Sequence, residues 1–355
     1  EEIFFNIDTP TLYVLAQMEF VGILLNTKYL EKLEHEFSLR IQQIEKEVEV
    51  IAGETINLRS PKQLSVLLFE KLQLPIIKKT KTGYSTDSEV LEELEYETKH
   101  PIPSLLIEYR ETDKLLSTYV KALPELVNAK TKRIHTHFNL HVAATGRLSS
   151  TNPNLQNIPI RSENGKRMRR AFISTPGKLL LTCDYSQVEL RLLAHFSEDP
   201  TMLEAFNNNI DIHAQTASEV LGMKVEDVTS NDRAIAKAVN FGLMYGQSSF
   251  GLARALKISR NDAKDYILKY FTRFGKVKSY LDSLKESCEV HGYAKTYYGR
   301  KRFLPDIKST NRTIKSMAER VAVNSPIQGT AADIIKFAMI AIDKEMKDKN
   351  LKSKM

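Results

Sequence analysis

The 355-residue sequence contains little cysteine and no long hydrophobic run. Its two cysteines, Cys183 and Cys288, provide neither a disulfide framework nor the spacing of a zinc site, so we expect a reducing, intracellular setting. No apolar stretch approaches the roughly 20 residues of a membrane span, and the longest candidate, 334–342, is interrupted by Lys336. We find no secretory signal, no internal repeat and no low-complexity tract. These absences argue against secreted disulfide-rich domains, membrane proteins and repeat proteins.

The composition is that of a globular protein with a surplus of basic residues. Hydrophobic residues make up 42% and charged residues 27%, and the formal net charge is +7. This surplus is compatible with nucleic-acid binding without establishing it, because many basic proteins bind no nucleic acid. The basic clusters at 78–81, 166–170 and 300–302 are separate, and each taken alone is best interpreted as a solvated face. The chain starts with Glu1 rather than Met, so we expect a piece of a longer protein.

Helical periodicity dominates the chain, and we predict an α+β fold that is mostly helical. The predicted helical segments are 9–50 with interruptions at Gly22 and Asn26, 60–72 with Ser60 as N-cap, 88–97, 103–119, 188–196, 202–244 with punctuation at Gly222 and at a Thr229/Ser230 cap, two helices within 259–292, and 313–348 with a break at Pro326. Alternating or apolar runs predict strands at 134–142 and 179–184, and a β-hairpin around Tyr298 and Gly299. The polar stretches 78–87 and 145–161 are typical of loops.

Asp184 closes the predicted strand 179–184. A carboxylate at a strand end is a rigid ligand for Mg²⁺, which prefers hard oxygen donors, and the backbone carbonyl of Tyr185 could join it. Two such ions about 3.5–4 Å apart would serve nucleotidyl transfer. The alternative is that Asp184 or Ser186 simply caps the following helix, and for an isolated aspartate this alternative is favoured.

A second pattern is a stripe of side chains four residues apart: Arg233, Lys237, Phe241 and Tyr245. On a helix this stripe is about 18 Å long, cationic at its N-terminal end and aromatic at the other. A nucleoside triphosphate has the same polarity, and the helix N-terminus after Ser230 adds a dipole that favours anions. Ordinary amphipathic helices also place aromatic core residues at this spacing, and spacing alone slightly favours that interpretation.

The residues around both patterns resemble motifs A and B of the bacterial DNA polymerase I family, family A. Motif A resembles residues 184–191, Asp-Tyr-Ser-Gln-Val-Glu-Leu-Arg, and motif B resembles residues 233–246, Arg-Ala-Ile-Ala-Lys-Ala-Val-Asn-Phe-Gly-Leu-Met-Tyr-Gly. The resemblance covers essentially the whole chain and implies a right-hand architecture of thumb, palm and fingers. It implies a lead-in helix at 1–25, a thumb at 26–130, the first part of the palm at 131–200, fingers at 201–323 and a return helix at 324–355.

The resemblance implies roles at the metal and the triphosphate. Asp184 would bind two Mg²⁺ ions, with Tyr185 contributing its carbonyl. Arg233 and Lys237 would hold the triphosphate, and Lys237 would also act catalytically by stabilising or protonating the leaving pyrophosphate. His213, within the matching string at 211–213, would contact the triphosphate, although alone it would be an ordinary helix-start residue.

The resemblance also implies roles at the sugar and base of an incoming deoxynucleotide. Glu189 would lie under the sugar and leave no room for a 2′-hydroxyl, although it could equally be an exposed first-turn residue favoured by the helix dipole. Tyr245 would guard the template position and pair with Glu189. Phe241 would stack on the base or sugar and is the variant associated with discrimination against dideoxynucleotides. Gln187 would complete the nucleotide site.

Two further segments, 145–159 and 318–335, resemble elements of the family that track DNA. Their arginines and amides suit the minor groove, where every base pair presents acceptors. Without the resemblance, the first segment would be a proline-fixed surface loop, and residues of the second could cap a break at Pro326. The loop at 78–87 would lie at the thumb tip and grip duplex phosphates. The residues assigned to DNA in this way are Arg147, Gln156, Asn157, Arg320, Asn324 and Gln328.

One part of the family pattern is missing from the sequence. In the family, a short hairpin with a His-Asp-Glu triplet follows, and its aspartate is the second metal ligand. Nothing after Gln328 supplies it: we interpret Asp333 as structural, and Asp306 is a poor substitute. We therefore expect a palm lacking its C-terminal part, and a fragment with weak or no activity from a DNA-directed DNA polymerase. That polymerase would act as a monomer on primed template DNA and deoxynucleoside triphosphates in the bacterial cytoplasm, associated with the nucleoid.

Two other classes of function remain open. A non-catalytic protein could use the same residues to bind primed DNA or nucleotides without metal chemistry. A relative of the single-subunit RNA polymerases would share the right-hand plan, but Glu189 argues against it because ribonucleotides need space at that position. A purely structural role would predict no binding to primed template.

Overall fold

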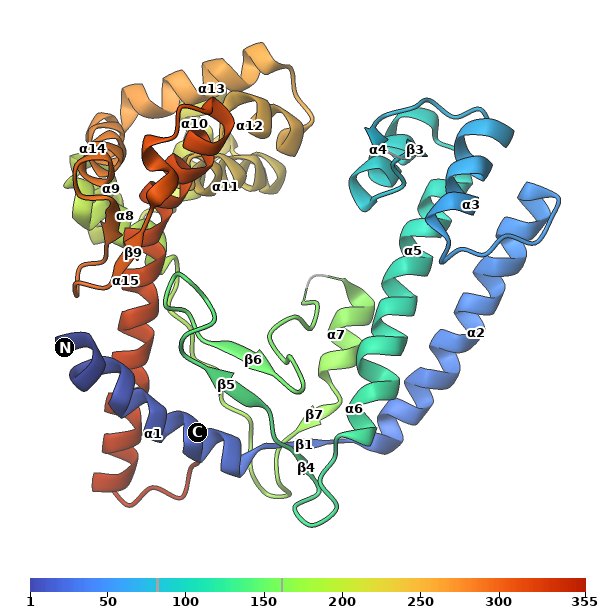
Figure 1. Cartoon of the computed structure of the whole chain (residues 1–355), viewed down its shortest axis with the longest axis horizontal. Coiled ribbons are helices and arrows are strands. Elements are labelled where there is room, and N and C mark those ends of the chain that lie inside the picture. Colours follow the sequence, from blue (N-terminus) through green and yellow to red (C-terminus); the bar gives the residue numbers. More distant parts are fainter. Residues whose placement is uncertain (81–82, 161) are drawn as a thin grey trace. The chain divides into compact units, whose positions relative to one another are not determined.

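The computed structural model describes residues 1–80, 83–160 and 162–355. Lys81 and Thr82 of the predicted loop 78–87 and Arg161 of the predicted loop 145–161 lie outside the described residues. The described chain is mostly helical with short strands (Figure 1), which confirms the α+β fold class. It divides into two compact units. Unit 1 comprises residues 1–18, 138–149 and 182–355, and unit 2 comprises 19–137 and 150–181.

Unit 2 is organised around two long helices, and its core follows directly from helical periodicity. Asn26 caps the first of them by accepting from the Tyr29 N–H at 3.0 Å, and Gly53 ends it in the left-handed region with φ +72°. Apolar residues three or four positions apart on this helix are buried against the second helix. The helices of unit 2 are α2 (Thr27–Ala52), α3 (Pro61–Ser65), η2 (Val66–Lys71), α4 (Ser88–Thr98), α5 (Pro101–Leu115), η3 (Leu116–Lys121), α6 (Ala122–Glu125) and α7 (Glu163–Arg169).

The strands of unit 2 are short. β1 (Ile23–Leu25) is the central strand of an antiparallel sheet between β4 (Arg133–Ile134) and β7 (Phe172–Ile173), with Ile23 opposite Ile134. β2 (Lys79–Thr80) pairs with β3 (Gly83–Tyr84) inside the predicted loop 78–87. The predicted strand 134–142 is found in two pieces, β4 and β5 (His137–Asn139). β5 and β6 (Ser149–Thr151) lie where the chain passes between the units.

Unit 1 is almost entirely helical. Its largest core joins apolar residues of α8, α11, α13, α14 and α15, among them Leu193, Val239, Tyr270 and Ile327. The predicted hairpin around Gly299 is present as β8 (Tyr293–Lys295) and β9 (Lys301–Phe303). The helices are η1 (Phe4–Asp8), α1 (Thr9–Val21, which ends in unit 2), α8 (Val188–Ser197), α9 (Pro200–Asn207), α10 (Ile212–Leu221), η4 (Val225–Asp227), α11 (Ser230–Met244), α12 (Ser249–Leu256), α13 (Arg260–Arg273), α14 (Gly275–His291), η5 (Pro305–Lys308) and α15 (Arg312–Asp348).

The predicted break at Pro326 is wrong, because α15 runs through this residue. A proline inside a helix removes one backbone hydrogen bond and usually kinks the helix. Here the neighbouring turns are tied by side chains: the Ser325 hydroxyl donates to the Val321 carbonyl at 2.7 Å, and the Thr330 hydroxyl donates to the Pro326 carbonyl at 2.6 Å. Pro326 is also buried, so packing around it helps to hold the helix in place.

The predicted strand 179–184 is also wrong. Residues 178–185 have no regular secondary structure, and the side chain of Leu179 is 94% exposed. A strand forms only when a neighbouring strand accepts and donates its backbone hydrogen bonds. None of the described strands pairs with this segment, so its apolar character alone does not make it a strand. Asp184 therefore stands in an irregular, exposed segment rather than at a strand end.

Within the described ranges, none of the helices has the length and apolar character needed to span a bilayer.

Candidate active site

The stripe of basic and aromatic residues lies on and just beyond α11. Thr229 caps this helix through a capping box: its hydroxyl accepts from the Asp232 N–H at 3.2 Å, and the Asp232 carboxylate accepts from the Thr229 N–H at 3.0 Å. Val239 and its apolar neighbours face the core, which leaves Arg233 and Lys237 exposed on another face. The helix therefore presents its two cations to solvent, as the spacing predicted.

Three rings follow one another at the aromatic end of the stripe. The ring centroids of His213 and Phe241 are 6.0 Å apart, and those of Phe241 and Tyr245 are 6.1 Å apart. Phe241 and Tyr245 are only partly buried, so they keep surface that a ligand could contact. A base or sugar edge can pack on such a surface because every base has a π face.

Arg233 is held by Asp211, a residue to which the sequence analysis gave no role. The Arg233 Nε donates to an Asp211 oxygen at 2.5 Å, while the other oxygen caps α10 by accepting from the N–H groups of His213 and Ala214. Burial alone would raise the pKa of Asp211, but the Arg233 hydrogen bond and these N–H groups lower it overall. The ion pair orients Arg233 and also occupies part of its hydrogen-bonding capacity.

His213 is a buried, neutral side chain. It is 2% exposed, and its Nδ1 accepts from the Asn240 side-chain amide at 3.1 Å. Burial, followed by the nearby charges of Arg233 and Lys237, lowers the pKa of His213 from 6.5 to about 4, although Asp211 opposes the shift. With Nδ1 accepting, the neutral ring can donate only through Nε2. His213 therefore differs from an ordinary helix-start residue, because its ring is buried and hydrogen-bonded to Asn240.

Asn240 was missed by the sequence analysis. It is fully buried on the core-facing side of α11, and its amide donates to His213 and, at 3.0 Å, to Thr216. The sequence did contain a signal: Asn240 is a polar residue among the apolar core positions of the helix. Buried polar groups nearly always have a hydrogen-bonding partner, so this position indicates a partner nearby.

Glu189 lies at the point where three distant segments meet. It is 7% exposed on the first turn of α8, which excludes the alternative of an exposed first-turn residue. One carboxylate oxygen accepts from the Arg147 guanidinium, and the other accepts from the Tyr245 hydroxyl. Burial and the Glu189 carboxylate raise the pKa of Tyr245 to about 12, although the Gln328 side chain and Arg147 act in the opposite direction. Unit 1 thus brings Arg147, Glu189, Tyr245 and Gln328 together.

Asp184 and Tyr185 are exposed in the irregular segment before α8. Gln187, rather than Asp184 or Ser186, occupies the N-cap position of that helix, in the left-handed region with φ +54° and without a side-chain capping hydrogen bond. The Asp184 carboxylate and the Tyr185 carbonyl are the kinds of oxygen that Mg²⁺ prefers. Across the described ranges, no group of three or more His, Cys, Asp or Glu side chains could hold a metal ion. The residues present therefore fit part of a magnesium site, to which they offer one carboxylate and one backbone carbonyl.

The residues assigned to DNA fall into two groups. Arg320, Asn324 and Gln328 follow at four-residue steps on α15, so they share one side of that helix. The Asn324 side-chain oxygen is buried and has no hydrogen-bonding partner among the described residues. Gln156 and Asn157 belong to unit 2, where both are exposed and the Asn157 carbonyl accepts from Tyr119 at 2.8 Å.

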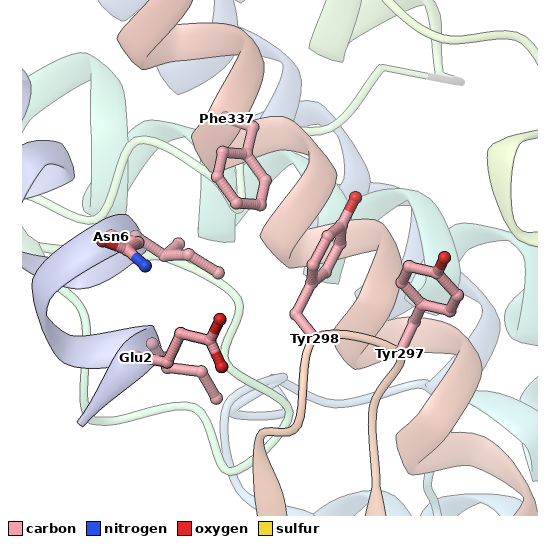
Figure 2. A pocket seen from close by; sticks show the side chains of 7 residues that line it. Glu2, Asn6, Tyr297, Tyr298 and Phe337 are labelled. Atoms are coloured by element: carbon pink, nitrogen blue, oxygen red, sulfur yellow. The ribbon is translucent and has the colours of Figure 1, made fainter.

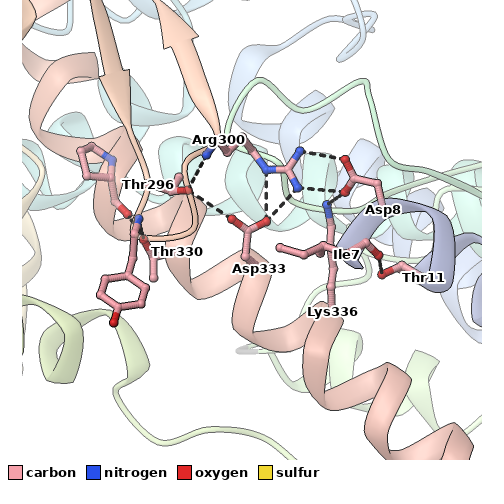
Figure 3. A network of polar contacts seen from close by, with 10 residues as sticks. Ile7, Asp8, Thr11, Thr296, Arg300, Thr330, Asp333 and Lys336 are labelled. Carbon is pink, nitrogen blue, oxygen red and sulfur yellow. Dashed lines mark hydrogen bonds and ion pairs between the residues drawn. The ribbon is translucent and has the colours of Figure 1, made fainter. Parts of the chain in front are cut away.

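Two other acidic residues and one pocket lie apart from these groups. Asp333 is completely buried and binds Arg300 and Thr296 (Figure 3), which supports its structural interpretation, while Asp306 is exposed in η5. A pocket of about 230 Å³ lies between the start of the chain and residues near β8 and in α15, and Figure 2 shows its lining side chains. It contains none of the candidate site residues and is lined by Glu2, Ile3, Asn6, Ile7, Tyr297, Tyr298 and Phe337.

Comparisons with known proteins agree on one family. Residues 27–355 match the family described as DNA polymerase family A. A DNA polymerase I of Caldicellulosiruptor bescii is 51% identical over 99% of this chain and 41% of its own length, and one of Geobacillus stearothermophilus is 46% identical over 99% and 40%. Among solved structures, the POL domain of Pol1 from M. smegmatis, in complex with DNA primer-template and dNTP, matches with a TM-score of 0.94. It is 44% identical, and the match covers 99% of this chain and 62% of that one.

Proposed function

The chain belongs to DNA polymerase family A, and on that basis we propose that it carries the deoxynucleotide and primer-template site of a DNA-directed DNA polymerase. It spans about two fifths of the length of the curated relatives that it matches, so the activity of the whole protein is part of this proposal. The reaction is the template-directed addition of a deoxynucleotide to the 3′-hydroxyl of a primer. In the solved relative, DNA primer-template and dNTP are the bound partners.

The observation that carries the proposal is the buried Glu189 carboxylate, held on one oxygen by Arg147 and on the other by Tyr245. A carboxylate held in this way has a fixed orientation, because rotating it would break two charge-assisted hydrogen bonds. Placed under the sugar of an incoming nucleotide, it would exclude a 2′-hydroxyl and so favour deoxynucleotides. Phe241 would face the base or sugar, and Tyr245 would guard the template position.

The triphosphate would lie along the cationic end of α11. Arg233 and Lys237 are exposed there, and the buried His213 would donate a neutral Nε2–H to a phosphate oxygen. The primer 3′-oxygen forms a bond to the α-phosphorus, the bond to the pyrophosphate oxygen breaks, and the hydroxyl proton passes to solvent. Arg233 and Lys237 would stabilise the charge on the departing pyrophosphate, and Lys237 could supply a proton to it.

Divalent metal ions, which we propose to be Mg²⁺, would polarise the phosphates and activate the hydroxyl when bound. Asp184 and the Tyr185 carbonyl would hold them, with Gln187 nearby in the nucleotide site. At the proposed metal site the one carboxylate is that of Asp184, and the described residues contain no group of three or more metal-binding side chains, so we propose that this chain by itself binds substrates with weak or no turnover. A fragment that binds primed DNA and nucleotides without catalysis is therefore the second candidate.

Each unit carries residues that we propose to contact DNA. In unit 1 these are Arg147, Arg320, Asn324 and Gln328, for the template and minor groove, and in unit 2 they are Gln156 and Asn157. The unpartnered, buried oxygen of Asn324 supports a ligand at that position, because such atoms usually find a partner.

We also propose a division into subdomains. They are a lead-in helix at 1–25, a thumb at 26–130, a palm at 131–200, fingers at 201–323 and a return helix at 324–355. We propose a monomer that acts in the bacterial cytoplasm at the nucleoid, in keeping with its bacterial relatives.

Primer extension and primed-template binding by the 355-residue chain test the proposal. The assay uses Mg²⁺, with deoxynucleotides and ribonucleotides supplied separately, and Asp184→Asn as the control. We expect binding that weakens with salt, with little or no extension. Extension that disappears in Asp184→Asn would refute the view that the chain lacks an essential ligand, and absence of binding would refute the DNA site.

A further inference from the structure

Arg300 is the centre of a partly buried network of charges in unit 1 (Figure 3). It stands in the turn between β8 and β9. Its guanidinium donates to the two oxygens of Asp8 at 3.1 and 2.8 Å, and its Nε and Nη2 donate to one oxygen of Asp333 at 3.1 and 2.8 Å. Lys336 also donates to Asp8, at 3.0 Å. The network therefore balances two cations with two carboxylates.

The surroundings fix Arg300 in one orientation. Asp333 is 0% exposed and Lys336 is 1% exposed. The Thr296 hydroxyl donates to the second Asp333 oxygen at 3.3 Å and accepts from the Arg300 N–H at 3.0 Å. Burial alone would raise the pKa of Asp8, but the hydrogen bonds from Arg300 and Lys336 lower it overall. A planar guanidinium bound by two carboxylates has little freedom to turn.

The backbone at Gly146 lies directly against this fixed side chain. Gly146 has φ +81°, and a Cβ placed there would lie 2.9 Å from both Cδ and Nε of Arg300. Its N–H donates to the Ala143 carbonyl at 2.9 Å, which closes a turn. The carbonyl of Thr145 lies 3.1 Å from the place where a Cβ on Gly329 of α15 would stand. The turn 143–146 therefore packs closely against both Arg300 and α15.

We propose that Arg300 is a positioning residue for Arg147. Arg147 directly follows Gly146 in the chain, and its guanidinium donates to Glu189. Because the backbone at Gly146 is held against Arg300, the position of the Arg147 Cα atom and the direction of its Cα–Cβ bond are fixed. Asp8 and Asp333 act one step further away by holding Arg300. The role of Arg147 at DNA rests on the proposed function, whereas the effect of Arg300 on the turn does not.

Hydrogen exchange of the free chain tests the effect on the turn. Arg300→Lys keeps a cation beside Asp8 and Asp333 but removes the planar group under Gly146. Arg302→Lys is the matched control, because Arg302 lies in the same hairpin but donates to Ser325 at 3.3 Å. With both variants folded by circular dichroism, we expect amide exchange over 143–148 to rise about tenfold in Arg300→Lys only, as local protection is lost. Unchanged exchange in Arg300→Lys would overturn the proposal.

A double-mutant cycle tests whether the effect reaches DNA through Arg147. Fluorescence anisotropy with a labelled primed template measures the affinity of the 355-residue chain, of Arg147→Ala, of Arg300→Lys and of the double variant. We expect Arg147→Ala to weaken binding about tenfold, and Arg300→Lys about threefold, with the double variant no weaker than Arg147→Ala. A loss caused by Arg300→Lys that persists beside Arg147→Ala would overturn the proposal, since Arg300 would then act elsewhere. If the unsubstituted chain does not bind primed template, the proposed function fails and the exchange result alone decides the positioning role.

Discussion

The neutrality of His213 has a measurable consequence for stability. In the folded chain this side chain is 2% exposed, accepts from the Asn240 amide and lies near the cations Arg233 and Lys237. Protonation would place a new N–H against the amide donor and a new charge beside two others. The pKa of His213 accordingly falls from 6.5 to about 4 on folding. In the unfolded chain the ring is solvated and titrates normally.

The sign of the effect follows from proton binding. Above pH 6.5 the ring is neutral in both states, so His213 adds no pH dependence. Between pH 6.5 and 4 the unfolded state binds more protons than the folded state, and stability falls as the pH falls. For pKa values of 6.5 and about 4, the free energy of unfolding decreases by about 2 kcal/mol between pH 7.5 and 5. That is a large share of the roughly 5–15 kcal/mol that stabilises a typical protein.

Urea unfolding followed by circular dichroism at pH 7.5 and pH 5 measures this loss. Because carboxylates also titrate in this range, the informative quantity is the difference between the unsubstituted chain and His213→Gln, which cannot be protonated. We expect the unsubstituted chain to lose about 2 kcal/mol more than His213→Gln. His141→Gln removes an exposed histidine and controls for the substitution itself. Equal losses in the unsubstituted chain and His213→Gln would refute the reasoning.

Three further changes test the site and its scaffold. Asp211→Asn keeps a side chain able to cap α10 but removes the ion pair with Arg233, so we expect triphosphate affinity in calorimetry to rise about threefold. Thr229→Ala removes the capping box of α11 and should lower the free energy of unfolding in urea by about 1 kcal/mol, whereas Thr229→Ser should retain it. Gly246→Ala should cost about 1 kcal/mol more than Gly222→Ala in the same assay. Both glycines have positive φ, but only at Gly246 would a Cβ also press on a side chain 3.2 Å away; equal costs would contradict this.

Much of the local structure could be predicted from the sequence because it depends on neighbours within a few residues. The capping groups at Ser60 and Thr229 lie where the sequence predicted helix caps, and Asn26, predicted as an interruption, caps α2. Four-residue spacing placed Arg233 and Lys237 on one exposed face of α11 without any knowledge of the remaining fold. The resemblance in motif strings likewise identified the family, which the comparisons confirm.

Only the tertiary structure decided which of these groups meet and which segments become regular. Arg147, Glu189 and Tyr245 are far apart in the sequence, and their hydrogen bonds exist because α8, α11 and the turn at Gly146 pack in unit 1. The segment 179–184 is not a strand because pairing requires a partner that its own residues do not specify. Pro326 stays inside α15 because burial and hydroxyl hydrogen bonds outweigh its local preference. Periodicity and capping are properties of neighbouring residues, whereas pairing, burial and pKa shifts arise from contacts between distant ones.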